Sequence, residues 1–308
     1  MSVLSRPEFH EEEAAYEYVE ARLWPNGPVC PRCGETERVG KLKGKTTRIG
    51  VHKCYKCRKP FTVKVRTIFE ASHVPMHLWL QAIYLICGSK KGFSANQLHR
   101  TLGVTLKTAW FMSHRIREAM RSGDLDPFGG NGGAVEVDET FIGRDRMKKA
   151  ERVGYQHKHK VLTLVDRDSG RACSIVVDKL RMTVIADILD ANVSREAHFM
   201  TDEAGWYTTL GWNFAEHGTV NHGRDEYVNP ADRTIHTNTI EGFFSVFKRG
   251  MRGVYQHCSK RHLQRYMAEY DFRYSNRAAL GVNDEERADN LLHGVIGRRL
   301  TYAQPVRR

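Results

Sequence analysis

The pattern of apolar and polar residues changes character near residue 130. Before that point apolar residues recur at helical spacing, which predicts a short helix over residues 11–23 and a helical segment over residues 73–120. Residues 121–133 hold five glycines and one proline, a composition typical of a linker. We therefore expect a domain boundary in this stretch.

After the linker, alternating apolar and polar residues predict β-strands. A three-strand meander that gives way to alternating helices and strands predicts a mixed sheet flanked by helices, as in ribonuclease-H-like nucleases. Periodicity leaves the strand order open. The expected strands cover residues 133–143, 159–170, 171–177, 198–202 and 217–221; the expected helices cover 182–191, 236–252 and 260–274, with a short helix from Ala204.

The chain of 308 residues is therefore expected to be a multidomain α+β protein. Its expected parts are an N-terminal helix (1–27), a metal-binding ribbon (28–70), a helical region (71–121), the linker (122–133), a mixed α/β domain (134–280) and a basic C-terminal tail (281–308).

Four of the seven cysteines form two Cys-x-x-Cys pairs, Cys30 with Cys33 and Cys54 with Cys57. Twenty residues separate the pairs, so a hairpin can form between them, and the pattern predicts a zinc ribbon. Such a zinc ion is structural, because four thiolates leave no open coordination position. The alternatives are two redox-active pairs or four buried thiols.

Lys and Arg outnumber Asp and Glu by 48 to 36. This surplus favours a nucleic-acid partner over a merely soluble basic protein. Residues 38–66 contain eleven Lys or Arg residues and no acid, so the ribbon is expected to follow a phosphate backbone. The candidate DNA contacts in this region are Lys41, Lys43, Lys45, Arg58 and Lys59.

A polar helix start follows Gly103 within the helical region. A helix, a turn containing Gly103 and a second helix form a helix-turn-helix pattern, which generic helical hairpins share. In the DNA-binding interpretation Thr105, Lys107 and Thr108 face DNA, while Ala109, Phe111, Met112 and Ile116 pack inward.

No signal peptide or membrane span is visible in the sequence. The N-terminus carries Glu11, Glu12 and Glu13, and the apolar stretch of residues 78–87 is too short to cross a bilayer. We expect a cytoplasmic, nucleoid-associated chain that contacts no membrane.

Three acids lie where a catalytic metal site could form. Asp138 interrupts an apolar strand, Asp202 ends a short strand, and Glu241 begins a late helix. Carboxylates from two strands and a helix can converge at one sheet edge and hold two Mg²⁺ or Mn²⁺ ions that flank a phosphodiester. Alternatively, Asp202 caps the helix from Ala204, and Asp138 is a sheet-edge acid paired with an arginine.

The late helix places polar residues on one face. Asn238, Glu241, Ser245, Lys248 and Arg252 follow at steps of three or four, so on a helix they stack on one side. This face could hold a metal ion and a phosphate together. The alternative for Asn238 and Glu241 is a capping box that satisfies backbone N–H groups at the helix start.

Taken together, these motifs resemble a known family. The cysteine pairs, residues 135–143 (VEVDETFIG), residues 201–207 (TDEAGWY) and residues 236–250 (HTNTIEGFFSVFKRG) are similar to bacterial insertion-sequence transposases with an N-terminal zinc ribbon and a DDE-type, ISXO-like catalytic domain. The resemblance covers nearly the whole chain, in the expected order.

The resemblance implies a ribonuclease-H-like catalytic fold, recognition of terminal inverted repeats, and Mg²⁺-dependent cleavage and joining of DNA. It assigns Asp138 and Asp202 as the first two acids. Some members have Asn followed by Lys at the third position, so Glu241, preferred as the better metal ligand, and Asn238 both stay candidates. Lys248 would contact the phosphate beside the scissile bond. Arg249 and Arg252 are further candidate DNA contacts.

The implied reaction joins two ends together, so a homodimer or larger assembly on double-stranded DNA is expected. Two other functions stay open. The chain could be a domesticated or inactive transposase that acts as a DNA-binding regulator, or a structure-specific nuclease that cuts without joining.

Overall fold

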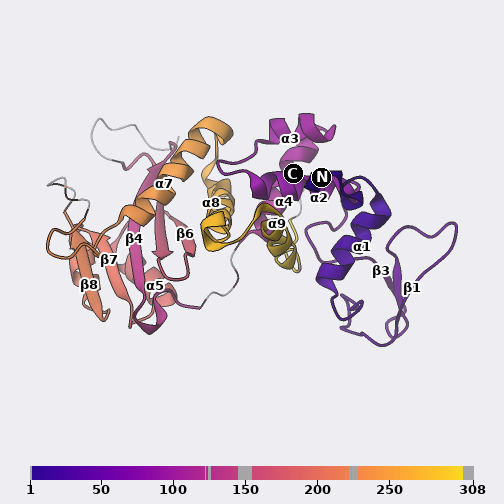
Figure 1. Cartoon of the computed structure of the whole chain (residues 1–308), viewed down its shortest axis with the longest axis horizontal. Coiled ribbons are helices and arrows are strands. Elements are labelled where there is room, and N and C mark those ends of the chain that lie inside the picture. The colour runs from indigo at the N-terminus through magenta and orange to yellow at the C-terminus, as the bar shows by residue number, and fades with distance from the viewer. Residues whose placement is uncertain are drawn as a thin grey trace, which may run out of the picture. The chain divides into compact units, whose positions relative to one another are not determined.

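A computed structural model describes residues 2–121, 123, 126–144, 155–221, 223, 226 and 228–300. The chain forms two compact units (Figure 1). Unit 1 combines residues 1–89, 93–121 and 282–308, and unit 2 combines residues 90–92 and 122–281. Unit 1 is therefore built from both ends of the chain.

The ribbon of unit 1 is a small antiparallel sheet. Its strands are β1 (Val39–Lys41), β2 (His52–Cys54) and β3 (Pro60–Phe61), and β2 lies between the other two. Cys30, Cys54 and Phe61 are buried together beneath it, against Trp24. So small an apolar core is typical of a ribbon that depends on a metal ion for stability.

Helices make up the rest of unit 1. They are α1 (Glu12–Leu23), α2 (Met76–Gly88), α3 (Ala95–Leu102), α4 (Leu106–Ala119) and α9 (Asp284–His293). Gly103 ends α3 in the left-handed conformation (φ 67°), where it has no Cβ to strain. Two helices joined at Gly103 agree with the expected helical hairpin, and its DNA-binding role stays a prediction.

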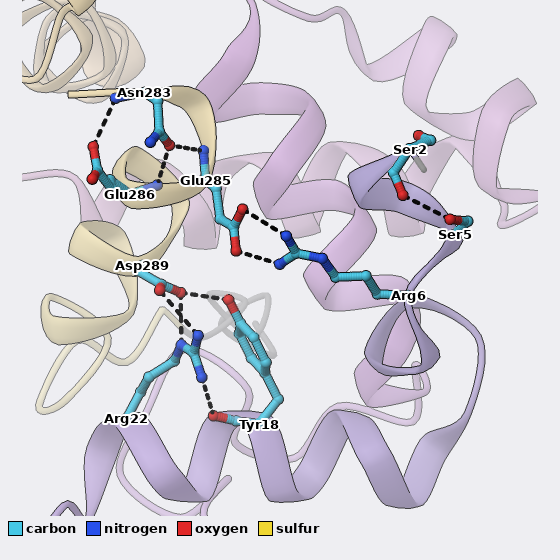
Figure 2. Close-up of polar contacts among 9 residues, drawn as sticks. All are labelled: Ser2, Ser5, Arg6, Tyr18, Arg22, Asn283, Glu285, Glu286 and Asp289. Atoms are coloured by element: carbon cyan, nitrogen blue, oxygen red, sulfur yellow. Dashed lines mark hydrogen bonds and ion pairs between the residues drawn. The ribbon is translucent and has the colours of Figure 1, made fainter. Parts of the chain in front are cut away.

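Residues 281–308 were expected to be a basic C-terminal tail, but they contain helix α9. Asn283 and Glu286 form a capping box at its start (Figure 2). The carboxylate of Asp289 accepts hydrogen bonds from the Tyr18 hydroxyl (2.6 Å) and Arg22 Nε (2.7 Å) of α1. Leu291 and Leu292 are buried, so α9 is a packed element of unit 1.

Unit 2 is built on a mixed five-stranded sheet in the order β6-β5-β4-β7-β8. Strand β4 lies at its centre, antiparallel to β5 and parallel to β7. The strands are β4 (Ala134–Ile142), β5 (His159–Asp166), β6 (Ala172–Val177), β7 (His198–Asp202) and β8 (Glu216–Val220); the helices are α5 (Met182–Asn192), α6 (Gly205–Gly211), α7 (Asn238–Gly250) and α8 (Lys260–Ser275).

Each face of this sheet carries its own apolar core. Val135, Val137 and Phe199 pack with α5 and α6 on one face. Val161 and Val165 pack with α7 and α8 on the other, and Figure 1 shows α7 lying across β4. Because side chains alternate along a strand, Glu136 and Asp138 face α7. Strand β4, which carries Asp138, is the central strand of the sheet. The alternative that Asp138 is a sheet-edge acid is therefore wrong.

Candidate metal and catalytic sites

The four ribbon cysteines converge on one point. Their sulfur atoms all lie within 4.8 Å of one another, with Sγ–Sγ distances of 3.8 Å for Cys30–Cys57 and 3.6 Å for Cys33–Cys54. A tetrahedral zinc ion with Zn–S bonds of about 2.3 Å requires sulfurs about 3.8 Å apart. Although burial opposes it, hydrogen bonds from the Arg32 and Cys33 backbone lower the pKa of Cys30 to about 7, which favours the thiolate that binds metal. The cluster fits structural zinc.

The ribbon cations proposed to contact DNA reach solvent. Lys41, Lys43, Lys45, Arg58 and Lys59 are all exposed. The ammonium of Lys41 lies 4.0 Å from Glu17 and 3.9 Å from Glu20 of α1, so its charge is partly balanced within unit 1.

Two of the three candidate helix-turn-helix contacts also act inside the fold. Thr105 is the N-cap of α4, and its hydroxyl accepts a hydrogen bond from the backbone N–H of Thr108 (3.1 Å). The two threonine hydroxyls lie 2.9 Å apart. Lys107 is exposed.

In unit 2, the parallel strands β4 and β7 bring two aspartates together. The negative charge of Asp202 acts on the carboxyl group of Asp138. Burial is the largest cause and, with Asp202 and Glu139, raises the pKa of Asp138 to about 8. Asp202 also accepts a hydrogen bond from the backbone N–H of Ala204 (3.0 Å), so it forms the turn before α6 as well. Asp202 does not cap α6 itself, because the N-cap of this helix is Ala204.

Lys248 supplies the positive charge of this cluster. Its ammonium lies 5.6 Å from the centre of the Phe244 ring and lowers the pKa of Asp138. Lys248 and Asp138 therefore lie on the same side of the sheet. This agrees with the prediction that the polar face of the late helix points toward the acids.

Glu139 points to the opposite face, toward α6. Burial, with a contribution from Asp202, raises the pKa of its carboxyl group to about 7. The Tyr207 hydroxyl and Trp206 indole N–H approach this carboxyl group and lower its pKa, yet no hydrogen bond of normal geometry forms. Glu139 Oε1 is thus a buried oxygen without a partner among the described residues.

Contacts near both ends of α7 relate this helix to β4. Its Ile240 N–H donates to Glu136 Oε2 (2.8 Å), and Met251, just past its end, lines a cavity together with Ile142. Asp138 is two residues beyond Glu136, or about 7 Å along the strand. A helix rises about 1.5 Å per residue, so the same distance along α7 from Ile240 reaches about as far as Phe244. Phe244 is roughly one turn from both Glu241 and Lys248.

The capping box expected for Asn238 and Glu241 is not what holds the start of α7. The N-cap is Thr237, and its side chain makes no capping hydrogen bond. The buried carboxylate of Glu136 performs this role from β4, where it satisfies a free N–H and complements the helix dipole. Asn238 is exposed and Glu241 partly so, which leaves both accessible as ligands.

Glu136 belongs to a network that sequence reasoning missed. Its Oε1 accepts a hydrogen bond from Arg167 Nε (2.5 Å), and Arg167 also donates to the carbonyl oxygens of Thr234 and His236 (2.6 Å each). The network ties β4, the end of β5 and the segment before α7 to one another. Glu136 sits two residues from Asp138 in VEVDE, but nothing in an alternating strand pattern distinguishes a structural acid from a catalytic one.

The donor set of unit 2 suits a hard divalent cation. Asp138, Asp202 and Glu241 offer only oxygen ligands, and the negative charge of Asp202 is one cause of the raised pKa of Asp138, after burial. Among the described residues, only the four cysteines form a set of three or more ligands that lie within 4.8 Å of one another. Asp138, Asp202 and Glu241 therefore do not form a set of that kind in this structure.

The chain thus has a four-cysteine cluster in one unit and, in the other, the neighbouring acids Asp138 and Asp202 with Lys248. The sequence profile of the ISXO2-like transposase domain matches residues 131–275, and that of the transposase zinc-ribbon domain matches residues 10–60. The chain belongs to the ISXO2-like transposases, the transposases of IS1595-type insertion elements.

Two further comparisons accompany this assignment. An "uncharacterized protein in transposable element ISH50" of Halobacterium salinarum is 27% identical over 283 residues, which cover 86% of this chain and 91% of that protein. A chain of the simian T-cell lymphotropic virus intasome in complex with PP2A regulatory subunit B56 gamma is 14% identical, with a TM-score of 0.29. That match covers 56% of this chain and 63% of the viral one. No described helix has both the length and the apolar character needed to cross a membrane.

Proposed function

We propose that this transposase binds the terminal inverted repeats of its element and cleaves and joins DNA at the acid cluster of unit 2, in a ribonuclease-H-like fold. The observation that carries the proposal is the pair Asp138 and Asp202 on adjacent parallel strands, with Lys248 beside them. When bound by these acids and Glu241, Mg²⁺ or Mn²⁺ ions would activate the attacking oxygen and stabilise the leaving one.

The side chains of the chain have separate roles in this proposal. Asp138, Asp202 and Glu241 hold the cations, with Asn238 as the alternative to Glu241. Lys248 donates to a non-bridging oxygen of the phosphate beside the scissile bond and keeps the DNA strand close to the acids. Glu136 fixes α7 against β4, so the distance between Lys248 and Asp138 is held by the protein itself.

The reaction is a pair of in-line displacements at phosphorus. In the first, water attacks phosphorus and loses a proton to solvent, the bond from phosphorus to the 3′-oxygen at the element's end breaks, and this oxygen takes up a proton to become a free 3′-hydroxyl. In the second, this hydroxyl attacks a target phosphodiester; the new P–O bond joins the element, and the target strand leaves with its own 3′-hydroxyl. Since two ends must be joined together, we propose that a homodimer or larger assembly acts on double-stranded DNA.

Strand transfer tests the proposal directly. A labelled, pre-cut duplex of the element's end is incubated with plasmid and Mg²⁺, using the wild type, Asp138→Asn and Asp202→Asn. We expect joining by the wild type and a loss of at least about a hundredfold in both variants, with DNA binding retained. Asp178→Asn, an exposed acid of unit 2 outside the cluster, is the control.

Other outcomes would replace the proposal. Binding without joining in the wild type would indicate a DNA-binding regulator. Cleavage without strand-transfer products would indicate a nuclease. Full joining by Asp202→Asn would contradict the assignment of this acid.

A further inference from the structure

A cavity of about 250 Å³ opens in unit 2 where β4 ends and β5 begins. Phe141, Ile142 and His159 form its sheet side, and Met251 and Leu263 form its apolar helix side. Residues Met251–Tyr255 form a short π-helix, η5, that directly extends α7. The cavity therefore lies at the ends of β4 and α7, two of the three elements that carry the proposed catalytic residues.

The charges around this cavity have one sign. Lys158 and the exposed Arg252 line it, and none of the described residues in its lining is acidic. Beside it, the Phe141 ring stacks on Tyr155, with ring centres 4.6 Å apart, and the ammonium of Lys158 lies 4.7 Å from the centre of the Tyr155 ring. Cations next to aromatic rings and an apolar floor are the features by which proteins hold unpaired nucleotides.

The position of the cavity relates it to the acids. Asp138 and Ile142 are four residues apart on the same face of β4, or about 13 Å along the strand. Arg252 follows Lys248 by four residues, about one helical turn further along α7. A DNA strand that advances about 3.4 Å per nucleotide would reach the cavity within roughly four nucleotides of the phosphate held at Lys248.

The size of the cavity selects the form of DNA. A space of about 250 Å³ lies just below the range of about 300–1,000 Å³ that drug-sized ligands occupy, which suits one nucleotide and excludes a duplex. We propose that this cavity binds one unpaired, unstacked nucleotide of the DNA strand held at the acid cluster. Lys158 and Arg252 contact its phosphate, and Phe141 forms the wall beside its base. This inference rests on the proposed function, because that function places DNA along α7.

Cys258 makes the inference measurable, because it is one of the residues that line the cavity. In the zinc-loaded full-length chain without Mg²⁺, alkylation of Cys258 by iodoacetamide is followed by peptide mass spectrometry. Cys173 serves as the internal reference, because burial raises the pKa of its thiol to about 12. The probes are a blunt duplex, the same duplex with a short single-stranded 3′ overhang, and inorganic phosphate.

We expect the overhang duplex to slow alkylation of Cys258 about tenfold, because stacking of one base on an aromatic side chain contributes binding energy of that order. The blunt duplex and phosphate should have little effect. Arg252→Gln and Lys158→Gln should each weaken binding of the overhang duplex about tenfold without weakening the blunt duplex equally. Lys179→Gln, an exposed cation of unit 2 outside the cavity, should bind both like the wild type.

Equal protection by the blunt duplex or by phosphate alone would overturn the inference, as would an unprotected Cys258 in a chain that binds the overhang duplex. The two proposals fail separately. Strand transfer with an unprotected Cys258 removes only the nucleotide cavity, whereas protection of Cys258 without strand transfer removes only the proposed reaction.

Discussion

At the scale of single residues, Asp271 shows how a buried carboxyl group couples this fold to pH. It lies on α8 and faces β6, where its oxygens accept hydrogen bonds from the Ser174 backbone N–H (2.9 Å) and hydroxyl (2.6 Å). The Ser174 hydroxyl is in turn 3.0 Å from that of Thr163. Burial raises the pKa of Asp271 from 3.8 to about 7, although both hydrogen bonds to Ser174 oppose the rise.

The direction of the resulting pH dependence follows from this shift. The folded chain holds the Asp271 proton more tightly than the unfolded chain, so the stabilisation is complete below pH 3.8 and is lost as the pH rises to about 7. Within that window each pH unit lowers the free energy of unfolding by about 1.4 kcal/mol. Asp271→Asn should remove this part of the slope. Urea unfolding of both chains across the window, in Mg²⁺-free buffer, measures it.

The exposed Asp187 of α5 provides the matched control, and Asp187→Asn should leave the slope unchanged. A slope in Asp271→Asn identical to that of the wild type would show that this carboxyl group titrates normally.

There is a physical reason why the sequence alone could point to the candidate catalytic residues. An aspartate inside an apolar strand is costly, so Asp138 marks a special position. Glu136 interrupts the same strand, but its partner Arg167 is 31 residues away and its hydrogen-bond donor Ile240 is 104 residues away. No local pattern encodes such contacts, and the Asn238–Glu241 spacing pointed instead to a cap that the structure does not contain.

At the scale of elements, the contact between β4 and the start of α7 determines the geometry of the proposed site. Glu136→Gln keeps the shape of the side chain but leaves Arg167 without its carboxylate. Breaking a buried ion pair in this way costs about 3–5 kcal/mol, so we expect a clear fall in the urea midpoint. We also expect loss of strand transfer under conditions in which the variant is still folded, because the spacing between Lys248 and Asp138 is no longer fixed.

The double variant Glu136→Gln/Arg167→Gln tests this explanation, because it removes both charges. It should recover part of the stability that the single variant loses. Glu203→Gln, which alters an exposed acid, should change neither property. Normal strand transfer by a folded Glu136→Gln chain would show that Glu136 has no positioning role.

The elements themselves were largely predictable, because alternation and helical spacing are local properties. Strands β4 to β8 and helices α5, α7 and α8 formed close to the expected residues. The insertion of β7 beside β4 was not predictable, because parallel pairing depends on contacts between distant segments. Helix α9 was not predicted, because its many charged residues suggested an exposed tail. In the structure two of its acids pair with cations, one on α1 and one in the segment that precedes α1.

At the scale of the whole molecule, unit 1 depends on residues from both ends of the chain. Beyond α9, the carbonyl oxygen of Val295 accepts a hydrogen bond from Ile68 N–H (3.2 Å), and Gly297 N–H donates to Arg66 (2.7 Å). Leu291, Leu292 and Val295 are buried, and each contributes about 1.5–3 kcal/mol of apolar burial. Together they account for a large share of the 5–15 kcal/mol that stabilises a typical domain.

A chain that stops after Gly281 should therefore lose the cooperative unfolding of unit 1 while unit 2 keeps its own transition. Limited proteolysis with fragment mapping measures both, because cleavage should concentrate in residues 1–121. A chain that stops after Leu300 retains α9 and should resist cleavage like the full-length protein. Equal resistance of residues 1–121 in both truncated chains would contradict the contribution of α9.

This arrangement also has a consequence for the order of synthesis. Unit 2 is inserted within unit 1, so the ribosome completes every residue of unit 2 before it produces α9. A nascent chain can therefore fold the acid-bearing sheet while the ribbon unit still lacks its last helix. Domains that fold during translation do so as their residues emerge, so unit 1 cannot be complete before the residues of α9 are made. Termination before α9 then yields chains with a folded sheet and an incomplete ribbon unit.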